Sequence, residues 1–562
     1  MSPHRGCAFF RAMALWQRHG FWLVAVRQNS KAQIAGFCFH LFAHSGYYDM
    51  KINYLCSSVR EIGMNIRSLI FIVLASLATA SHSQTVWPGG VDSVAAVAAD
   101  DTPSVARTAH FGQSSPRRPW LAAAEVVAAN LGILAADYYV LDADFAKVTW
   151  RTVGRNLSPS KWYWDSDIFR TNLLLHPYHG SIYYNAARSN GLDFYWSIPF
   201  AVGGSLMWEI AGEMEQPSVN DFLATSVSGL AIGEVIHRLA ERVYDNRSRG
   251  AERVAREIVG ALLNPAGGFT RLVTGNTFRL GSVPPSDLQA RQLPLDFSVT
   301  LGVRLLGTNQ GGKPHRYGGT LNFGFVYGSP VEPANSRPYD FFRANIGFDL
   351  SGGESMVGNL NIIGQIRQWM LADTGASRLS LGIYQHFDYY ATDSIHGKTP
   401  YKVSEAASVG AGLAWRRLTH GVSLSEELYV NGVLLGGALS DYRENRYRRD
   451  YSMGSGYSLK SITELGVGRW LRARLLADMK HLFSWHGYED EDPAKKYIEY
   501  SVMGDRGNVV SLLLRPSLEL SLNRHWGAEA SAFLVFRDFH YKYHPDVSST
   551  AYDYRLAVKY RF

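Results

Sequence analysis

The chain has 562 residues, a formal net charge of +7 and a hydrophobic fraction of 46%. Its 13% aromatic content and 53 glycines exclude a disordered or collagen-like protein, and its length exceeds one typical domain. The first 83 residues hold eight Lys/Arg, two acidic residues and all three cysteines. The other 479 residues are nearly neutral, with 48 basic and 47 acidic side chains, so nucleic acid is not expected as a partner.

A secretion signal begins at Met64. The segment MNIR is followed by the apolar run SLIFIVLASL and a small-x-small site, which is the pattern of a signal peptide and too short to span a bilayer. We predict a signal peptide at 64–83 and interpret residues 1–63 as a misannotated extension of the reading frame. The mature chain would start near Ser81 or Gln84, be exported, and contain no cysteine.

The next segments differ in composition. Residues 84–117 are rich in Ala, Asp, Ser and Pro without a period, which predicts a flexible periplasmic linker. Residues 118–275 are predicted to form a helical domain, with helix-length segments at 120–141, 194–213, 219–244 and 251–263.

Local signals support these helices. Ser218 lies three residues before Asp221, as in a capping box, and Gly229 and Gly233 form a small-residue stripe that lets helices approach closely. Residues 198–208 are apolar but too few to span a bilayer. We expect this segment to be buried within the domain or against the mouth of a barrel.

Several motifs of this region resemble the domain-of-unknown-function family 3943 of bacterial envelope proteins. They are LHPYHGSIYYNAARSN at 175–190, GGSxxWE from Gly203, SxND from Ser218, GxxxGE from Gly229 and RGxER from Arg249. The resemblance covers about residues 118–275 and implies an envelope domain. The name of the family leaves its activity open, so the resemblance implies no reaction.

Imidazoles and carboxylates are concentrated in the same domain. The candidate polar cluster is His176, His179, Glu209, Glu213, Asp221, Glu234 and His237. Such groups could bind a metal or act as acid and base, or could instead cap helices and pair with Arg170, Arg188, Arg238 and Arg253. No zinc-peptidase or nucleophile-elbow motif is present. We therefore predict no metal and no cofactor, favour a non-enzymatic role, and leave the catalytic residues unassigned.

The C-terminal segment predicts a transmembrane barrel. From Tyr552 to Phe562, apolar and polar residues alternate over eleven positions, which matches one tilted strand across a bilayer. Tyr560 and the terminal Phe562 resemble the insertion signal of Gram-negative outer-membrane barrels. Similar segments predict twelve strands within 290–562, at 295–306, 319–328, 339–350, 358–371, 377–390, 402–416, 421–433, 457–469, 471–483, 508–522, 527–540 and 551–562.

The predicted fold is thus a small periplasmic helical domain followed by an antiparallel barrel of about 12 strands. Charged residues on the polar strand faces are predicted to line the lumen: Arg304, Arg343, Arg367, Arg472, Arg474, Asp478, Lys480, Arg515, Glu519 and Arg555. They could close the lumen by pairing or leave a narrow polar path.

The location predicted from these patterns is the outer membrane of a Gram-negative bacterium, with the helical domain in the periplasm at the barrel mouth. The leading function is passage or binding of a small molecule or lipid, or envelope organisation. The alternatives are a lipid- or cell-wall-acting enzyme that uses the polar cluster, and a structural or interaction protein. Expected partners are outer-membrane lipid, lipopolysaccharide and the barrel-assembly machinery. The basic and aromatic loop 441–450 would suit lipopolysaccharide phosphates, although a simply solvated loop is the default interpretation.

Overall fold

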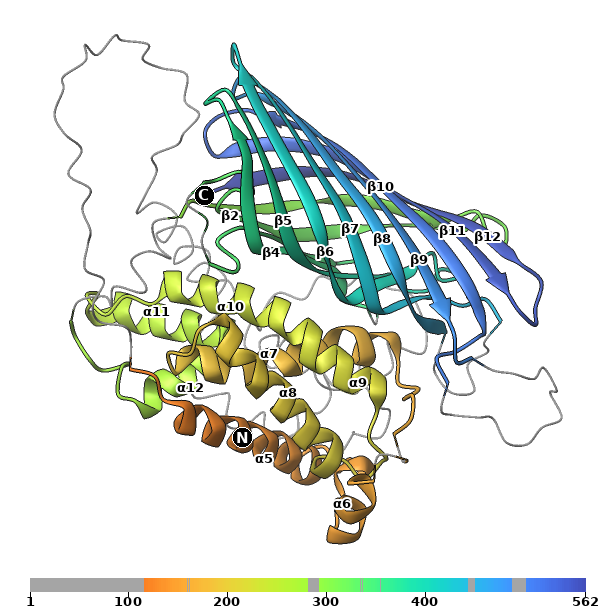
Figure 1. Ribbon diagram of the computed structural model, residues 1–562. Coiled ribbons are helices and arrows are strands. Elements are labelled where there is room, and N and C mark those ends of the chain that lie inside the picture. Colours follow the sequence, from red (N-terminus) through yellow and green to blue (C-terminus); the bar gives the residue numbers. More distant parts are fainter. Residues whose placement is uncertain are drawn as a thin grey trace, which may run out of the picture. The chain divides into compact units, whose positions relative to one another are not determined.

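The structure, a computed structural model, describes residues 116–281, 293–442, 450–487 and 502–562, apart from positions 159, 161, 334, 336 and 354. These residues belong to one compact unit, Val73–Phe562. They form a helical domain and a closed barrel (Figure 1). The predicted N-terminal extension, signal peptide and nearly all of the linker lie outside the described residues, as does most of the loop 441–450.

Helices account for most of residues 119–273, and the four predicted helical segments are confirmed. Two π-helical turns, η3 and η4, make longer continuous helices of their neighbours. The elements are α5 (Pro119–Tyr139), η1 (Asp144–Ala146), α6 (Trp150–Asn156), η3 (Thr171–Leu175), α7 (His176–Ser189), α8 (Phe194–Ala211), α9 (Val219–Leu223), η4 (Ala224–Ser228), α10 (Gly229–Val243), α11 (Gly250–Leu263) and α12 (Pro265–Val273).

The central helix α7 is absent from the predicted segments. Its Pro177 and Gly180 are poor helix formers, which conceals it in the sequence. Pro177 is tolerated because it stands in the first turn, and Gly180 is needed because a Cβ there would lie 1.7 Å from the Thr225 carbonyl oxygen. Gly229 meets the Gly180 backbone in the same way, and Gly233 meets the Tyr184 ring. The predicted close approach at Gly229 and Gly233 is confirmed.

The predicted twelve-stranded antiparallel barrel is also confirmed. Each strand pairs with its neighbours in sequence, and β1 pairs with β12 to close the barrel, so no strand edge remains open. The strands are β1 (Leu295–Thr308), β2 (His315–Tyr327), β3 (Phe342–Asp349), β4 (Val357–Asp373), β5 (Ser377–Ala391), β6 (Lys402–Thr419), β7 (Val422–Leu439), β8 (Tyr451–Val467), β9 (Leu471–Ser484), β10 (Gly507–Ser521), β11 (Trp526–Tyr541) and β12 (Val547–Arg561).

One predicted loop is too long. Residues 434–456 were expected to connect two strands, but β7 continues to Leu439 and β8 already begins at Tyr451. Gly436, Gly437 and Gly454 lie in this hairpin and interrupt the alternation of apolar and polar residues. The register of β7 and β8 also shifts there, which removes the period that would have shown the strands in the sequence.

The helical domain lies against the outer face of the barrel wall. On β5, His386 and Asp388 point inward, so Gln385 and Tyr389 point outward. Gln385 Nε2 donates to the Val227 carbonyl at 2.8 Å, and the Tyr389 ring lies 5.3 Å from that of Phe169. Figure 1 shows α10 lying next to the strands. The sequence predicted contact at the barrel mouth, but these contacts extend along the wall.

The contacts run from one end of the barrel to the other. Near the start of β1, Arg242 Nη1 donates to the Leu293 carbonyl at 2.7 Å, and Arg238 pairs with Asp340 at 3.1 Å. Near the opposite end, the Tyr451 hydroxyl donates to the Asp167 carbonyl and accepts from Asn172 Nδ2, both at 2.8 Å. The aromatic and small outward-facing residues of β2–β8 provide the surface on which the helices pack.

Candidate functional site

The seven residues of the predicted polar cluster divide into two groups. Asp221, His176, Glu209 and Glu213 lie at one end of the helical domain and are called here the end cluster. Glu234 lies with Arg188 and Arg238 in the middle of the domain, and His237 is on the same helix. His179 borders the end cluster: its Nε2 lies 2.6 Å from the Tyr183 hydroxyl, and its ring meets the edge of Trp208, which donates to Glu213.

The end cluster is built around the start of α9. Ser218 is its N-cap and accepts from the Asp221 backbone N–H, while the Ser218 N–H donates to Glu209 Oε2 at 2.7 Å. His176, the first residue of α7, places Nε2 3.4 Å from Asp221 Oδ1. Glu213 follows α8 and accepts from Trp208 Nε1 at 2.6 Å. Three carboxylates and an imidazole therefore surround one helix start.

Tyr163 and Asp165 also belong to this site and were not predicted. The Asp165 backbone N–H donates to Asn220 Oδ1 at 2.8 Å, and the Tyr163 hydroxyl donates to Asp165 Oδ1 at 3.2 Å. The segment around Tyr163 is held against α9 by a parallel bridge to Ser218. The signal for these residues in the sequence is Asp165 and Asp167 within an otherwise aromatic segment.

The second group is a compensated ion network. Glu234, fully buried, accepts from Arg188 Nε at 2.7 Å, Arg238 Nε at 2.9 Å and the Tyr184 hydroxyl at 2.7 Å. Arg238 continues to Asp340, in the loop between β2 and β3. Among the described residues, no hydrogen-bond partner is found for His237 Nδ1. Glu234 therefore links α7 to α10 and, through Arg238, to the barrel.

The buried carboxyl of Glu213 is expected to make the stability of the folded chain depend on pH. Burial raises the pKa of its carboxyl to about 8; His176 opposes this and Asp221 adds to it. Because the pKa in the folded state lies above that in the unfolded state, the folded state binds more protons, and stability falls as pH rises from about 4.5 to about 8. We expect Glu213→Gln, which keeps an acceptor for Trp208, to reduce this pH-dependent loss in the free energy of unfolding by on the order of 2 kcal/mol.

The measurement is thermal unfolding of the full chain in detergent between pH 5 and pH 9. Glu252→Gln is the matched control because this carboxylate is exposed and pairs with Arg256 on the surface. Equal pH slopes for wild type and Glu213→Gln would contradict the assignment.

The barrel interior contains a second polar site. Lys480 on β9 lies 2.9 Å from Asp388 on β5, 2.9 Å from Glu405 on β6 and 2.6 Å from Asp478. Lys460 adds a contact of 2.6 Å to Asp388. Strands β5 and β9 are not neighbours in the closed barrel, so these contacts cross the lumen. The five side chains are fully or almost fully buried and are called here the lumen network.

The three carboxylates of the lumen network approach within 4.8 Å of one another, which is close enough for a cation. The Lys480 ammonium, however, already contacts all three. The positive charge at this position therefore comes from the chain itself.

Apolar layers lie on both sides of the lumen network. Toward the end of the barrel where β1 finishes, one buried cluster includes Leu306 of β1, Tyr390 of β5, Leu513 of β10 and Phe533 of β11, so it joins strands that are far apart around the barrel. Toward the other end, Tyr384, Tyr429 and Ile462 pack together, and Arg343 pairs with Glu427 across the lumen at 2.9 Å. Side chains fill the described interior in successive layers.

The other predicted lumen residues are placed as follows. Arg304 pairs with Asp349 and Asp553, and Arg555 also pairs with Asp553. Arg472 pairs with Glu464, and Glu519 pairs with Lys559 and Arg561. Arg474 lies on the face of β9 that carries Asp478 and Lys480, and Arg515 on the face of β10 that carries Glu519.

Arg367 was wrongly placed in the lumen. It is exposed and pairs across β4 and β5 with Ile383, an exposed residue on the outer face. The register of β4 shifts between Gln365 and Arg367, which turns the following residues to the opposite face.

Tyr560 and Phe562, the predicted insertion signal, lie in a group of aromatic residues where the barrel closes. The Phe562 ring stacks on Phe297 of β1 at 4.7 Å, and the Tyr560 ring lies 4.8 Å from Trp526.

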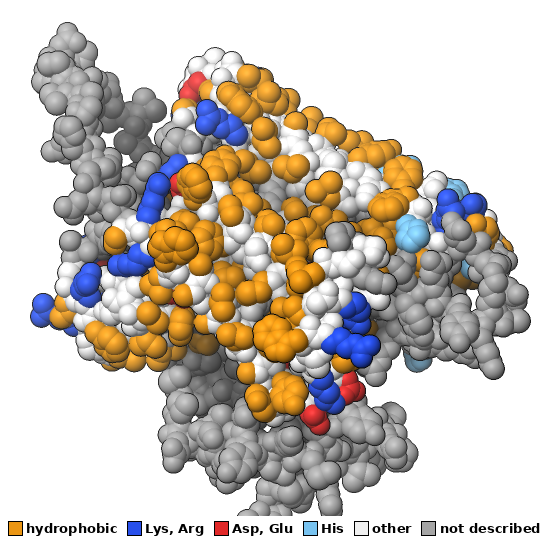
Figure 2. Space-filling view, turned by 60° about the horizontal axis from the view of Figure 1, so that its bottom comes forward, with side chains coloured by type: hydrophobic (Ala, Val, Ile, Leu, Met, Phe, Trp, Pro, Cys, Tyr) orange, Lys and Arg blue, Asp and Glu red, His pale blue; other side chains and the backbone are white. Residues whose placement is uncertain are grey.

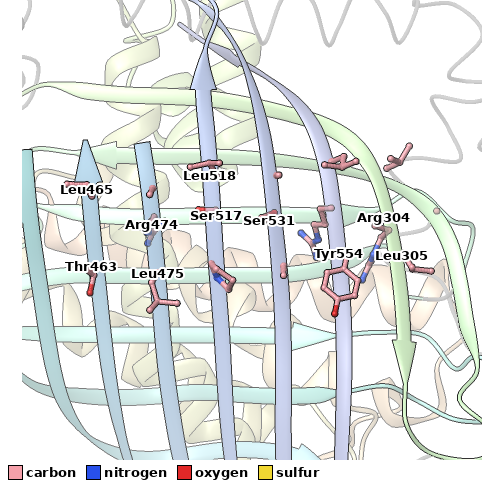
Figure 3. A pocket seen from close by; sticks show the side chains of 18 of the residues that line it. Arg304, Leu305, Thr463, Leu465, Arg474, Leu475, Ser517, Leu518, Ser531 and Tyr554 are labelled. Carbon is pink, nitrogen blue, oxygen red and sulfur yellow. The ribbon is translucent and has the colours of Figure 1, made fainter. Parts of the chain in front are cut away.

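A concavity of about 1140 Å³ lies on the wall formed by β8–β12, β1 and the adjoining part of β2 (Figure 3). Its lining is dominated by exposed apolar side chains, including Leu475, Leu518, Tyr554 and Leu556. These residues belong to the outward-facing apolar rows of the strands. An apolar lining of this kind matches the acyl chains of membrane lipid.

Comparison with protein families supports the domain assignment. Residues 161–266 match the family model described as domain of unknown function (DUF3943). The predicted resemblance is confirmed over this shorter range. No curated protein matches the chain.

Solved structures similar to the chain are outer-membrane barrels. The translocator domain of autotransporter NalP from Neisseria meningitidis is 14% identical with a TM-score of 0.19, covering 48% of this chain and 88% of that one. An outer-membrane channel from Pseudomonas putida F1 is 10% identical with a TM-score of 0.25, covering 48% and 95%. OmpT of Vibrio cholerae is 9% identical with a TM-score of 0.21, covering 48% and 98%. Similarities this low imply nothing about activity.

Proposed function

We propose that this outer-membrane protein binds lipid through its helical domain and does not pass solutes through its barrel. The observation that carries the proposal is the filled lumen. The lumen network joins β5, β6, β8 and β9 across the interior, and apolar layers close the space on both sides of it. A continuous aqueous path would require these buried ion pairs to separate, which is costly in a low-dielectric interior.

The end cluster is the proposed binding site for the lipid headgroup. Its carboxylates and imidazole offer hydrogen-bond acceptors to hydroxyl or ammonium groups, and exposed apolar residues lie close by, among them Leu157 and Met214. A polar site bordered by apolar surface suits an amphipathic ligand. We expect the barrel-assembly machinery to insert the chain after export, as the predicted signal peptide and insertion signal imply.

We predict no channels when the full chain is inserted into planar bilayers, and bound phospholipid when it is extracted in mild detergent and examined by native mass spectrometry. His176→Ala should weaken lipid binding about tenfold, the effect of one lost charge-assisted hydrogen bond. His540→Ala is the matched control because the His540 side chain is exposed near the end of β11 and forms its ion pair with Asp546, far from the end cluster in the sequence.

Stable single-channel currents from the wild type would contradict the sealed barrel. Equal lipid retention by both histidine variants, with unchanged unfolding temperatures, would remove the end cluster as the headgroup site.

A second candidate function is a lipid- or cell-wall-acting enzyme. The observation that favours it is the 3.4 Å approach of His176 Nε2 to Asp221, since a carboxylate beside an imidazole can orient it as a general base. Turnover of phospholipid or peptidoglycan that is lost in both His176→Ala and Asp221→Asn would favour this function over binding alone.

A further inference from the structure

The outer surface of the helical domain is apolar where a water-soluble domain would be charged. On α5 the exposed positions are occupied by Pro, Trp, Ala, Val, Leu, Gly and Tyr, without one charged residue. On α8 the exposed positions are Tyr195, Trp196, Pro199, Gly203 and Leu206. Exposed Val254, Ile258 and Leu262 follow one face of α11, and Phe269, Leu272 and Val273 extend this surface on α12. Figure 2 shows hydrophobic side chains spread across this face.

Exposed charges are found at the two ends of the domain. Arg117 and Asp193, which precede α5 and α8, form a pair at 3.5 Å, so both helices start at the same end. Asp144 and Lys147 follow α5 at the other end, where the Met214 N–H donates to the Phe145 carbonyl at 2.7 Å. The 21 residues of α5 cover about 31 Å, close to the ~30 Å hydrocarbon thickness of a bilayer.

Large exposed aromatic residues lie at the same two ends of the domain. Trp120, Tyr195 and Trp196 stand at the starts of α5 and α8, and Tyr139 and Trp150 lie beyond the far end of α5 or in its last turn. Trp120 and Trp150 are 88% and 91% exposed, which is unusual for indole rings in water. Trp and Tyr are enriched at both interfaces of a membrane because their rings are amphipathic.

The buried acid Glu125 of α5 fits the same environment. Glu125 points into the domain, where it accepts from Asn190 Nδ2 at 2.8 Å and the Thr270 hydroxyl at 2.7 Å. Ionisable residues in membrane segments face the protein interior and are paired. Helix α5 and the continuous segment Val219–Val243 also have the length and hydropathy of membrane spans, and only 22% of the α5 window is buried in the protein.

The apolar surface is continuous with that of the barrel. Helices of the domain cover outward-facing residues of β5 at Gln385 and Tyr389, whereas Val430 of β7 and Leu556 of β12 stay exposed on the same barrel wall. The contacts at Leu293 and Tyr451 place the ends of the domain at the ends of the barrel. The exposed apolar bands of helices and strands therefore lie side by side.

We propose that the helical domain is immersed in the hydrocarbon core of the outer membrane beside the barrel, with bilayer acyl chains against α5, α8, α11 and α12. The sequence instead predicts a periplasmic domain, which would leave these side chains in water. The inference concerns the location of the domain and holds whether or not the end cluster binds a lipid headgroup.

The test uses single cysteines, because residues 84–562 contain none. Leu131→Cys, 60% exposed in the middle of α5, is compared with Val430→Cys, 60% exposed on the barrel wall, and with Arg249→Cys, exposed at one end of the helical domain. Each full-chain variant, with Cys7, Cys38 and Cys56 also replaced by serine, is reconstituted into phosphatidylethanolamine and phosphatidylglycerol vesicles. In one sample, a charged maleimide labels those cysteines that water reaches. In a second sample, the cysteine carries a bimane fluorophore and the lipid has brominated acyl chains, which quench the fluorophore on contact.

We expect Leu131→Cys to lose labelling by the charged maleimide and to show the same bimane quenching as Val430→Cys, while Arg249→Cys labels fully and is not quenched. Labelling of Leu131→Cys equal to that of Arg249→Cys would overturn the proposal in favour of a domain in water. Protection of Leu131→Cys without quenching would also overturn it, since a second copy of the chain or another protein would then cover α5.

Discussion

Gly180→Ala is expected to destabilise the helical domain by about 2 to 3 kcal/mol, the cost of overpacking at a tight contact. A Cβ at this position would lie 1.7 Å from the Thr225 carbonyl oxygen and 2.6 Å from its carbonyl carbon, both backbone atoms of η4. Backbone atoms cannot turn away as a flexible side chain can. The helix α7 must therefore move away from η4 and α10, and the contacts of Glu234 with Arg188 and Tyr184 lengthen with it.

Far-UV circular dichroism of the full chain in detergent, followed during thermal unfolding, measures this effect. Gly132→Ala is the matched control: it is also a helical glycine, and its Cβ would meet no atom within 4 Å. There the change is expected to stabilise by about 0.5 to 1 kcal/mol, because alanine is the better helix former. If both variants unfold alike, the close approach of α7 and η4 is not what holds the domain together.

Lys480→Met is expected to destabilise the barrel by about 3 to 5 kcal/mol, because it leaves buried carboxylates without their partner. Lys480 contacts Asp388, Glu405 and Asp478, and only Lys460 would remain to compensate them. Methionine fills a similar volume, so the loss comes from charge rather than from a cavity. Adding Glu405→Gln, which removes one of the carboxylate charges, should recover part of the stability.

The temperature at which the folded barrel loses its compact mobility on a gel measures this loss. The control is Arg378→Met, since Arg378 pairs with Asp373 and Glu332 at the surface and is expected to contribute less than about 1 kcal/mol. A Lys480→Met variant as heat-resistant as Arg378→Met would show that the lumen network does not hold the barrel together. It would also weaken the case for a sealed lumen.

The sequence alone determined the class, the strand number and most strand positions of the barrel. A strand between lipid and a polar interior must alternate at every residue, so a single strand such as Tyr552–Phe562 carries the information locally. The same locality reveals the start of α9, where Ser218 caps the helix, and the small residues at Gly229 and Gly233. Prediction from the local alternation fails at Arg367 and between β7 and β8, because a register shift interrupts the period there.

Charge and cysteine content distinguish the first 83 residues from the rest of the chain. The excess of basic residues and all cysteines lie before residue 84, and the described domains follow in a nearly neutral chain. The signal peptide at 64–83 stays a prediction.

Only the tertiary structure decided which polar residues meet. His176 and Asp221 are 45 positions apart, and Lys480 and Asp388 are 92 apart, so their contacts depend on helix packing, barrel closure and register rather than on any local pattern. For the same reason Glu234 lies apart from the end cluster, although the sequence analysis grouped them in one polar cluster. The position of the helices along the outer wall is likewise a property of two complementary surfaces, and neither surface shows in its own sequence what it will contact.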